Sequence, residues 1–251
     1  MAYLPSLNSL SYNEQMFADG RNVVFPTSFH FSPTLKAVTL VLAARSDLDR
    51  LEELIHSLSW LVTYADRLTF CSASADCRLS FPVMRTWRLH SLTSFTGQRV
   101  SVESEDLLSL GELPHLRKLD IETRTERNEY RAPPRGRQAW FFPALQDFKL
   151  HAKEALSRPE VAAAGLFTDL CTALAGLPCP DTIQYVTISL PVGDDVVNDG
   201  NLFPSPCLEP LLSLHSLRSL RVLDGCKVIV DDAMLNNMSL AWPGIRILLF
   251  E

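Results

Sequence analysis

Residues 113–121 contain the clearest copy of a pattern that recurs along the chain: Leu113-Pro114-His115-Leu116-Arg117-Lys118-Leu119-Asp120-Ile121. The three apolar residues of the pattern are Leu116, Leu119 and Ile121, separated by two variable residues and then by one. Pro114 stands two positions before the first of them. The last positions alternate apolar and polar as in a half-buried β-strand, and proline ends a preceding helix and favours extended backbone. Each copy is therefore expected to begin a strand.

Nine copies of the pattern can be placed on the sequence. The five clearest carry the proline and occupy residues 4–12, 81–89, 113–121, 142–150 and 242–250. Four weaker copies occupy residues 35–40, 65–70, 183–188 and 217–222. Their first apolar residues stand at positions 7, 35, 65, 84, 116, 145, 183, 217 and 245. The mean spacing is about 30 residues, at the long end of the roughly 20–29 residue period of leucine-rich repeats.

Several of the intervening segments have a helical period. Apolar residues follow one helical face in segments 48–61, 104–113, 161–177, 207–214 and 231–242. Asp231 or Asp232 is placed to cap the last of these helices. The interval after position 116 has no helical pattern. It contains residues 123–139, with five arginines and Pro133-Pro134, and these are expected to form a long exposed loop.

Strands and helices that alternate at a near-constant spacing predict a solenoid, because one repeat cannot bury its own apolar face and must stack on its neighbours. We expect an α/β leucine-rich-repeat solenoid of the ribonuclease-inhibitor-like type. Its parallel strands would line the concave face, and helices and loops would lie on the convex face. Residues 1–251 are expected to form a single irregular domain of about nine repeats.

Composition limits the function classes. Hydrophobic residues make up 47 % of the chain and charged residues 21 %, as in soluble folded proteins. A net charge of −6 and a pI near 5.5 give no general attraction for nucleic acid or anionic membranes. No signal peptide is recognisable, and the six cysteines lack any CxxC spacing. We expect reduced thiols, no nucleic acid or membrane partner, and a cytoplasmic or nuclear location.

Motifs for catalysis and metal binding are missing from the sequence. His115 and His151 have no zinc-ligand partner at the usual spacing, and the acidic residues 194–199 lack the alternating ligands of a calcium loop. There is no GxSxG motif, phosphate-binding loop or dinucleotide fingerprint. The sequence therefore predicts no enzyme, no metal and no cofactor.

Strand alternation indicates which residues face away from the core. Those expected to contact a protein partner on the concave face are Arg67, Arg88, His90, Lys118, Asp120, Asp147, Lys149, His151, Tyr185 and Arg221. Tyr185 is the expected aromatic anchor, since aromatic residues dominate binding energy at interfaces. The alternative is that these are ordinary solvated strand residues.

The last repeat resembles a known family. Residues 230–250 place Asp231 and Asp232 before a helix that ends in Ala241-Trp242-Pro243 and leads into a strand. This arrangement is similar to the repeat region of F-box/leucine-rich-repeat proteins, in the form expanded in mushroom-forming fungi. The resemblance implies a non-catalytic substrate-recognition part of an SCF-type ubiquitin ligase. The alternative is a stand-alone leucine-rich-repeat scaffold with no ubiquitin link.

The amino-terminal F-box of such proteins is not expected in this chain. Leu4-Pro5 leads directly into a strand copy, and the proline-rich segment 25–33 cannot form the helical module. A ligase adaptor would therefore be a partner only if an F-box stands upstream. Neither end of the chain carries the polar cap that solenoids need, which favours a fragment or pairing with another chain.

Overall fold

The computed structural model describes residues 3–4, 7–13, 30–31, 35–42, 65–72, 77–78, 89–98, 100–101, 104–123, 141–152, 161–190, 202–223 and 227–251. The predicted helix at 48–61, the acidic turn at 194–199 and residues 124–139 of the predicted arginine-rich loop lie outside these residues. Thr123, the first residue of that loop, is instead the last residue of a strand.

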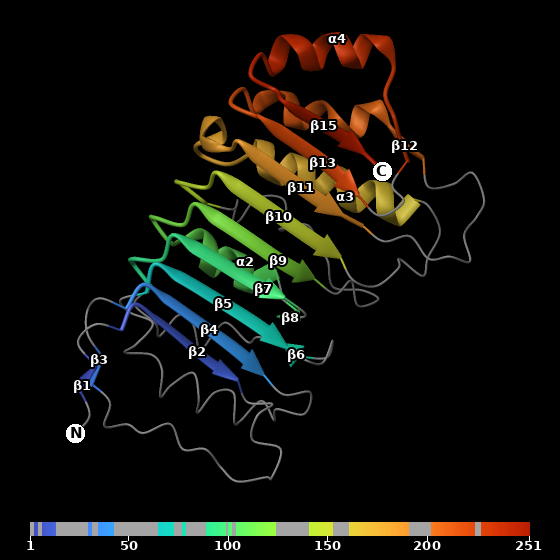
Figure 1. Ribbon diagram of the computed structural model, residues 1–251. Coiled ribbons are helices and arrows are strands. Elements are labelled where there is room, and N and C mark those ends of the chain that lie inside the picture. The colour runs from blue at the N-terminus through green and yellow to red at the C-terminus, as the bar shows by residue number, and fades with distance from the viewer. Residues whose placement is uncertain are drawn as a thin grey trace.

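Within the described residues, nine strands form one parallel sheet in which each strand lies beside the next repeat's strand (Figure 1). The order β2-β4-β5-β7-β9-β10-β11-β13-β15 follows the sequence without a crossover. The strands are β2 (Ser9–Asn13), β4 (Ala37–Leu42), β5 (Arg67–Ser72), β7 (Ser94–Gln98), β9 (Lys118–Thr123), β10 (Asp147–Ala152), β11 (Tyr185–Ser189), β13 (Ser219–Leu223) and β15 (Ile247–Phe250). This is the predicted α/β leucine-rich-repeat solenoid.

The helical elements lie on one side of this sheet (Figure 1). They are α2 (Ser104–Gly111), α3 (Val161–Ala175), α4 (Asp232–Ala241) and the 3₁₀ helices η3 (Pro180–Thr182) and η4 (Ser205–Ser213). The helices predicted at 104–113, 161–177 and 231–242 are thus confirmed. The segment predicted at 207–214 is a 3₁₀ helix instead, and Pro206 and Pro210 in it lack the amide hydrogens that an α-helix would use.

Three short parallel pairs accompany the main sheet within the described residues. They are β1 (Tyr3–Leu4) with β3 (His30–Phe31), β6 (Cys77–Arg78) with β8 (Val100–Ser101), and β12 (Leu202–Pro204) with β14 (Lys227–Ile229). Strand β14 lies between β13 and α4 in the chain, and the first turn of α4 is capped by Asp231. The carboxylate Oδ1 of Asp231 accepts a hydrogen bond of 2.7 Å from the Met234 amide. This decides between the two predicted caps.

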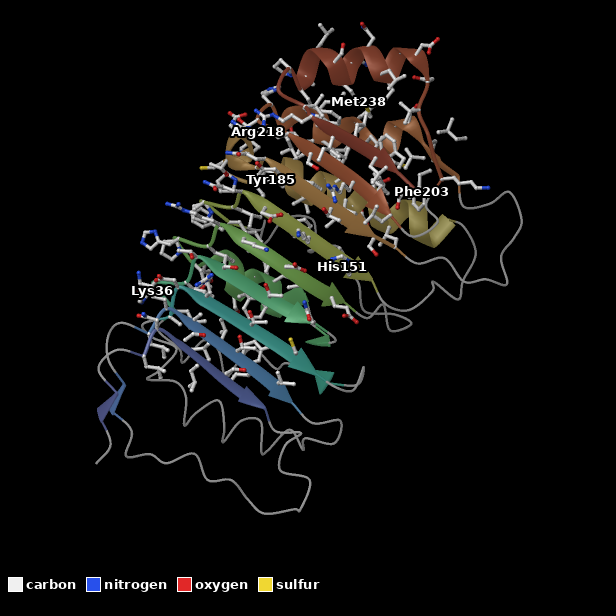
Figure 2. The ribbon with its side chains drawn as sticks, in the orientation of Figure 1. Lys36, His151, Tyr185, Phe203, Arg218 and Met238 are labelled. Atoms are coloured by element: carbon white, nitrogen blue, oxygen red, sulfur yellow. The ribbon has the colours of Figure 1, made fainter. Side chains whose placement is uncertain are left out.

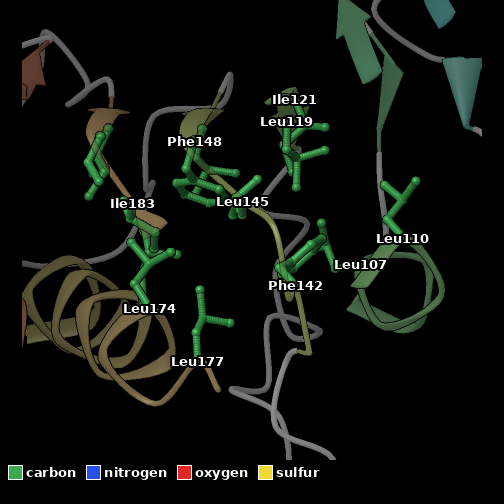
Figure 3. Packing of buried hydrophobic residues seen from close by; sticks show 14 of the residues in the cluster. Leu107, Leu110, Leu119, Ile121, Phe142, Leu145, Phe148, Leu174, Leu177 and Ile183 are labelled. Carbon is green, nitrogen blue, oxygen red and sulfur yellow. The ribbon is translucent and has the colours of Figure 1, made fainter. Parts of the chain in front are cut away.

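The core lies between the sheet and the helices. Figure 3 shows Leu119, Ile121 and Phe148 of the strands facing Leu107 and Leu110 of α2, with Leu174 and Leu177 of α3 beside them. The first apolar residue is also fully buried in the inner repeats, as at Leu116, Leu145, Ile183 and Leu217, and it is partly buried in the two end repeats, at Leu7 and Ile245. Burying one such side chain contributes about 1.5–3 kcal/mol, so the repeated leucine pattern is the main source of stability.

Each strand begins with the same backbone hydrogen bonds. The Arg117 amide donates to the Thr93 carbonyl at 2.8 Å, the Gln146 amide to the Arg117 carbonyl at 2.8 Å, and the Gln184 amide to the Gln146 carbonyl at 2.9 Å. The ladder continues from Arg218 to Gln184 at 2.7 Å. Because the bond repeats from strand to strand, equivalent residues of successive repeats stand side by side.

The fourth repeat differs from its predicted position. The prediction placed its first apolar residue at Met84, whereas the strand is β7 and the first apolar residue is Leu92, 27 residues after Ala65 and 24 before Leu116. Phe95 of β7 is fully buried and its ring centroid lies 5.9 Å from that of Phe70. The correct copy was missed because its last core position is Gly97, which carries no side chain to complete the apolar pattern.

Candidate functional site

The side of the sheet opposite the helices presents three rows of side chains, which we call the open face (Figure 2). The strand register aligns each row across the repeats. The first row is Ser9, Ala37, Arg67, Ser94, Lys118, Asp147, Tyr185, Ser219 and Ile247. The middle row is Ser11, Thr39, Thr69, Thr96, Asp120, Lys149, Thr187, Arg221 and Leu249. The third row is Val41, Cys71, Gln98, Glu122, His151, Ser189 and Leu223.

Opposite charges meet at the centre of the open face. The register pairs Lys118 with Asp147, Asp120 with Lys149, and Glu122 with His151. We call these six residues the central charged patch. Each pair joins a basic residue to an acidic residue, and the sign of the charge changes once along each strand, after Lys118 on β9 and after Asp147 on β10. Such cross-strand pairs contribute roughly 0.2–1 kcal/mol each.

One ion pair within the patch runs diagonally between the strands. The His151 Nε2 atom lies 3.7 Å from Asp120 Oδ1, and the His151 side chain is 40 % exposed. At this distance and exposure the pair contributes at most about 1 kcal/mol when the histidine is protonated. The His151 ring therefore remains accessible to a ligand on the open face.

Asp147 is a half-buried carboxylate of the patch. Burial raises the pKa of its carboxyl group, the nearby Lys149 and Lys118 ammonium groups lower it, and Asp120 raises it, with burial the largest effect. Its Oδ1 atom is shielded from solvent and accepts no hydrogen bond from the described part of the chain. A shielded acceptor without a donor costs roughly 1–3 kcal/mol. The patch thus carries a carboxylate that a nearby donor would stabilise.

The chemistry of the open face changes along the sheet. Toward β2 the middle row carries hydroxyl groups, from Ser11 to Thr96. Beyond the central charged patch the face becomes more apolar: Tyr185 is 43 % exposed and Ile247 is 40 % exposed. Tyr185 stands beside Asp147 in the register and so borders the patch directly. An aromatic ring next to complementary charges is the composition typical of a protein-binding hot spot.

Eight of the ten residues predicted for the binding surface lie on strands of the open face: Arg67, Lys118, Asp120, Asp147, Lys149, His151, Tyr185 and Arg221. The structure brings six of these together on β9, β10 and β11, namely Lys118, Asp120, Asp147, Lys149, His151 and Tyr185. Their role in binding stays a prediction. Arg88 lies outside the described residues.

His90 was assigned wrongly. It lies in an exposed turn four residues before β7 and not on the sheet, because the fourth strand begins at Ser94. Ser94, Thr96 and Gln98 occupy the open-face positions of the fourth strand, to which the prediction assigned Arg88 and His90. The open face at the fourth repeat is therefore neutral rather than basic.

Sequence reasoning also missed a set of exposed basic residues at the starts of the strands. Lys36, Arg117, Arg218 and Arg246 each stand one residue before a strand and are exposed. The sequence signal was present: each directly follows the first apolar residue of its repeat. The alternation of apolar and polar residues did not identify them, because they stand before the strand residues that alternate.

The described part of the chain was also compared with what a metal site, a reactive thiol or a membrane span would need. These residues contain no group of three or more His, Cys, Asp or Glu side chains that could hold a metal ion. Cys71, Cys171, Cys179 and Cys207 are free thiols. Burial, and to a smaller extent Cys207, raises the pKa of Cys171 well above its ordinary value, so this thiol is not a nucleophile. No helix among the described residues is long and apolar enough to cross a membrane.

Comparisons with known proteins give a distant structural likeness. No family model and no curated protein matches the chain. Among solved structures, the chain is similar to an internalin from Listeria monocytogenes, with 13 % identity and a TM-score of 0.36. The alignment covers 86 % of this chain and 54 % of the internalin, so the chain spans about half the length of that protein. The repeat fold follows from the chain's own parallel strands and their register.

Proposed function

We propose that residues 1–251 act as a single, non-catalytic protein–protein interaction domain, and that the open face holds the partner. Solenoids use such extended sheet surfaces for binding, because adjacent repeats present a continuous array of side chains. The observation that carries this proposal is the central charged patch with Tyr185 beside it. These side chains lie on three neighbouring strands, and Asp147 has a shielded oxygen that accepts no hydrogen bond from any described residue.

The chemistry of this region suits a protein surface better than a small substrate. Its charges have both signs, which matches the mixed polar rim of protein interfaces. Catalysis would need a nucleophile, a base and an orienting group in mutual contact. On the open face, the His151 Nε2 and Asp120 Oδ1 atoms lie 3.7 Å apart, which is too far for a hydrogen bond.

Within this class we propose a role like that of the substrate-recognition part of an F-box subunit of an SCF-type ubiquitin ligase, in the cytoplasm or nucleus. The capped helix α4, which ends at Ala241 and leads through Trp242-Pro243 into β15, supports the resemblance to fungal F-box/leucine-rich-repeat proteins. The second candidate is a stand-alone scaffold with no ubiquitin link. The two differ in whether a ligase adaptor and a cullin accompany the natural full-length protein.

The experiment is affinity purification of the tagged protein from its native cells, with quantitative mass spectrometry of the co-purifying proteins. The test variant combines Lys149→Glu with Tyr185→Ala, which changes one patch charge and removes the exposed ring. The matched control combines Lys227→Glu with Leu240→Ala. Lys227 and Leu240 are exposed on β14 and α4, away from the patch, and give the same charge change and an apolar truncation.

We expect the test variant to lose at least ten-fold of a discrete partner, as for truncation of a hot spot worth about 1.4 kcal/mol or more. The control should retain that partner. Equal recovery with both variants would rule out the central charged patch as the binding surface. An adaptor and cullin in the wild-type eluate would support the ligase role, and a partner without them would support the scaffold.

A further inference from the structure

Six basic residues line one edge of the open face, where the chain enters the strands. Lys36, Arg117, Arg218 and Arg246 stand one residue before β4, β9, β13 and β15, and Arg67 and Lys118 are the first residues of β5 and β9. We call this set the basic rim. Five of the six are exposed and Lys118 is half-buried. Figure 2 shows Lys36 and Arg218 along the same edge of the sheet.

Backbone hydrogen bonds place these residues in one line. The Asp66 amide donates to the Lys36 carbonyl at 2.9 Å, and the Arg246 amide donates to the Arg218 carbonyl at 2.8 Å. The same ladder joins the intervening strands. Since neighbouring strands lie about 4.8 Å apart, Lys36 and Arg117 are separated by about 14 Å, as are Arg117 and Arg218. Arg218 and Arg246 are immediate neighbours.

The rim has a charge opposite to that of the protein as a whole. The two described positions per strand that form this edge hold six cations but only two carboxylates, Asp66 and Asp147. The entire chain has a net charge of −6. Several described acidic residues, including Asp169, Asp181 and Glu209, lie instead on the helical elements or beside them. Positive charge is thus concentrated along one edge of an acidic molecule.

Arg218 and Arg246 carry the greatest excess of positive charge. They are exposed and adjacent, and no carboxylate of the described chain lies within ion-pair distance of either guanidinium. Like charges on neighbouring strands destabilise a sheet. A carboxylate bound between the two guanidinium groups removes that repulsion and forms charge-assisted hydrogen bonds with both.

We propose that the basic rim binds an extended acidic segment of the protein partner. This inference rests on the proposed protein-binding function and names the chemistry of one part of the partner. An extended peptide advances about 3.3 Å per residue, so acidic residues roughly four apart match the 14 Å steps between Lys36, Arg117 and Arg218. Gln146 and Gln184 stand between Arg117 and Arg218 in the backbone ladder, and glutamine side chains can form hydrogen bonds with peptide groups.

A polypeptide fits the rim better than a nucleic acid does. Single-stranded nucleic acids are held by a continuous basic groove together with aromatic side chains on which bases stack. Among the described positions that form this edge, Tyr185 is the one aromatic residue, and the cations come in separated groups.

The test uses a fluorescent deca-glutamate peptide and fluorescence anisotropy at low and physiological salt. The rim variant combines Arg218→Gln with Arg246→Gln. The matched control is Lys227→Glu, which changes the net charge by the same two units at an exposed position on β14. A single-stranded deca-nucleotide of similar charge is titrated in parallel.

We expect the wild-type protein to bind the peptide in a salt-dependent manner, the rim variant to bind at least ten-fold more weakly, and the control to stay within two-fold of wild type. An equal loss in the control would refute the rim, because binding would then depend on net charge alone. Tighter binding of the oligonucleotide than of the peptide would also overturn the proposal. If the rim fails while Lys149→Glu with Tyr185→Ala still abolishes partner capture, only the rim is refuted and the open-face function stands.

Discussion

Replacement of Trp242 by alanine should detach the last repeat without unfolding the rest of the sheet. Trp242 follows α4, its side chain is 1 % exposed, and its indole Nε1 donates a 3.2 Å hydrogen bond to the buried Leu211 carbonyl of η4. Met234 and Met238 are the buried residues of α4 itself. Trp242 therefore joins the final helix and strand to the preceding repeat by both packing and a hydrogen bond.

The expected cost follows from these contacts. Truncation of a buried tryptophan to alanine destabilises by about 3–5 kcal/mol. Replacement by phenylalanine keeps most of the apolar contact but loses the donor to Leu211, which costs about 1–2 kcal/mol. Because each 1.4 kcal/mol is a factor of ten, the alanine variant should open its last repeat roughly a thousand-fold more often, and the phenylalanine variant about ten-fold more often.

The assay is hydrogen exchange followed by mass spectrometry. In a solenoid each repeat contacts only its neighbours, so we expect lost protection in residues 227–251 and unchanged protection in β9, β10 and β11. Leu240→Ala is the control, since Leu240 lies on the same helix but is 74 % exposed. Uniform loss of protection across the sheet, or no change with Trp242→Ala, would contradict this account of how the repeats are coupled.

Four further predictions follow from single residues. Phe148→Ala, at a fully buried position of the interior strand β10, should lower the free energy of unfolding by about 3–5 kcal/mol in urea denaturation, and a loss below 1 kcal/mol would show that the core is not closely packed there. Asp231→Ala should cost α4 about 1 kcal/mol through loss of the bond to the Met234 amide, whereas Asp232→Ala should cost less; thermal denaturation of the two variants decides. Burial raises the pKa of the Asp147 carboxyl group above 3.8 in the folded chain. Ionisation of Asp147 therefore opposes folding, and the free energy of unfolding falls as the pH rises through this raised pKa. Asp147→Asn should therefore gain stability relative to wild type between about pH 3 and pH 7 in denaturant titrations, and parallel pH profiles would refute the assignment. Iodoacetamide should alkylate exposed Cys179 at least ten-fold faster than buried Cys171 in the native protein and at equal rates in urea, as followed by peptide mapping.

Most of the fold could be predicted because its signal is carried by large apolar side chains. Leu116, Leu119 and Ile121 show the spacing and are buried as that spacing requires. The prediction failed where the side chain gave no signal. At the fourth repeat Gly97 fills a core position, and the proline-preceded residues 81–89 offered a false copy that ends only three residues before Leu92.

The candidate site could be predicted less well, for a different physical reason. Alternation shows which face a strand residue takes, and it placed Asp120, Lys149 and Tyr185 correctly. It contains no information on the register between strands, so the pairing of Lys118 with Asp147 came only from the structure. The basic rim precedes the alternating positions and depends on hydrogen bonds between repeats that are far apart in the sequence.

The constant strand register also separates two kinds of change in this protein. Leu92 and Leu116 lie 24 residues apart and Leu145 and Ile183 lie 38 apart, yet the strands between them remain paired residue for residue. The difference in repeat length therefore leaves the pairing of these strands unchanged. A single substitution on a strand changes a side chain of the open face without altering the length of any repeat. Repeat length and open-face chemistry can in this way change independently.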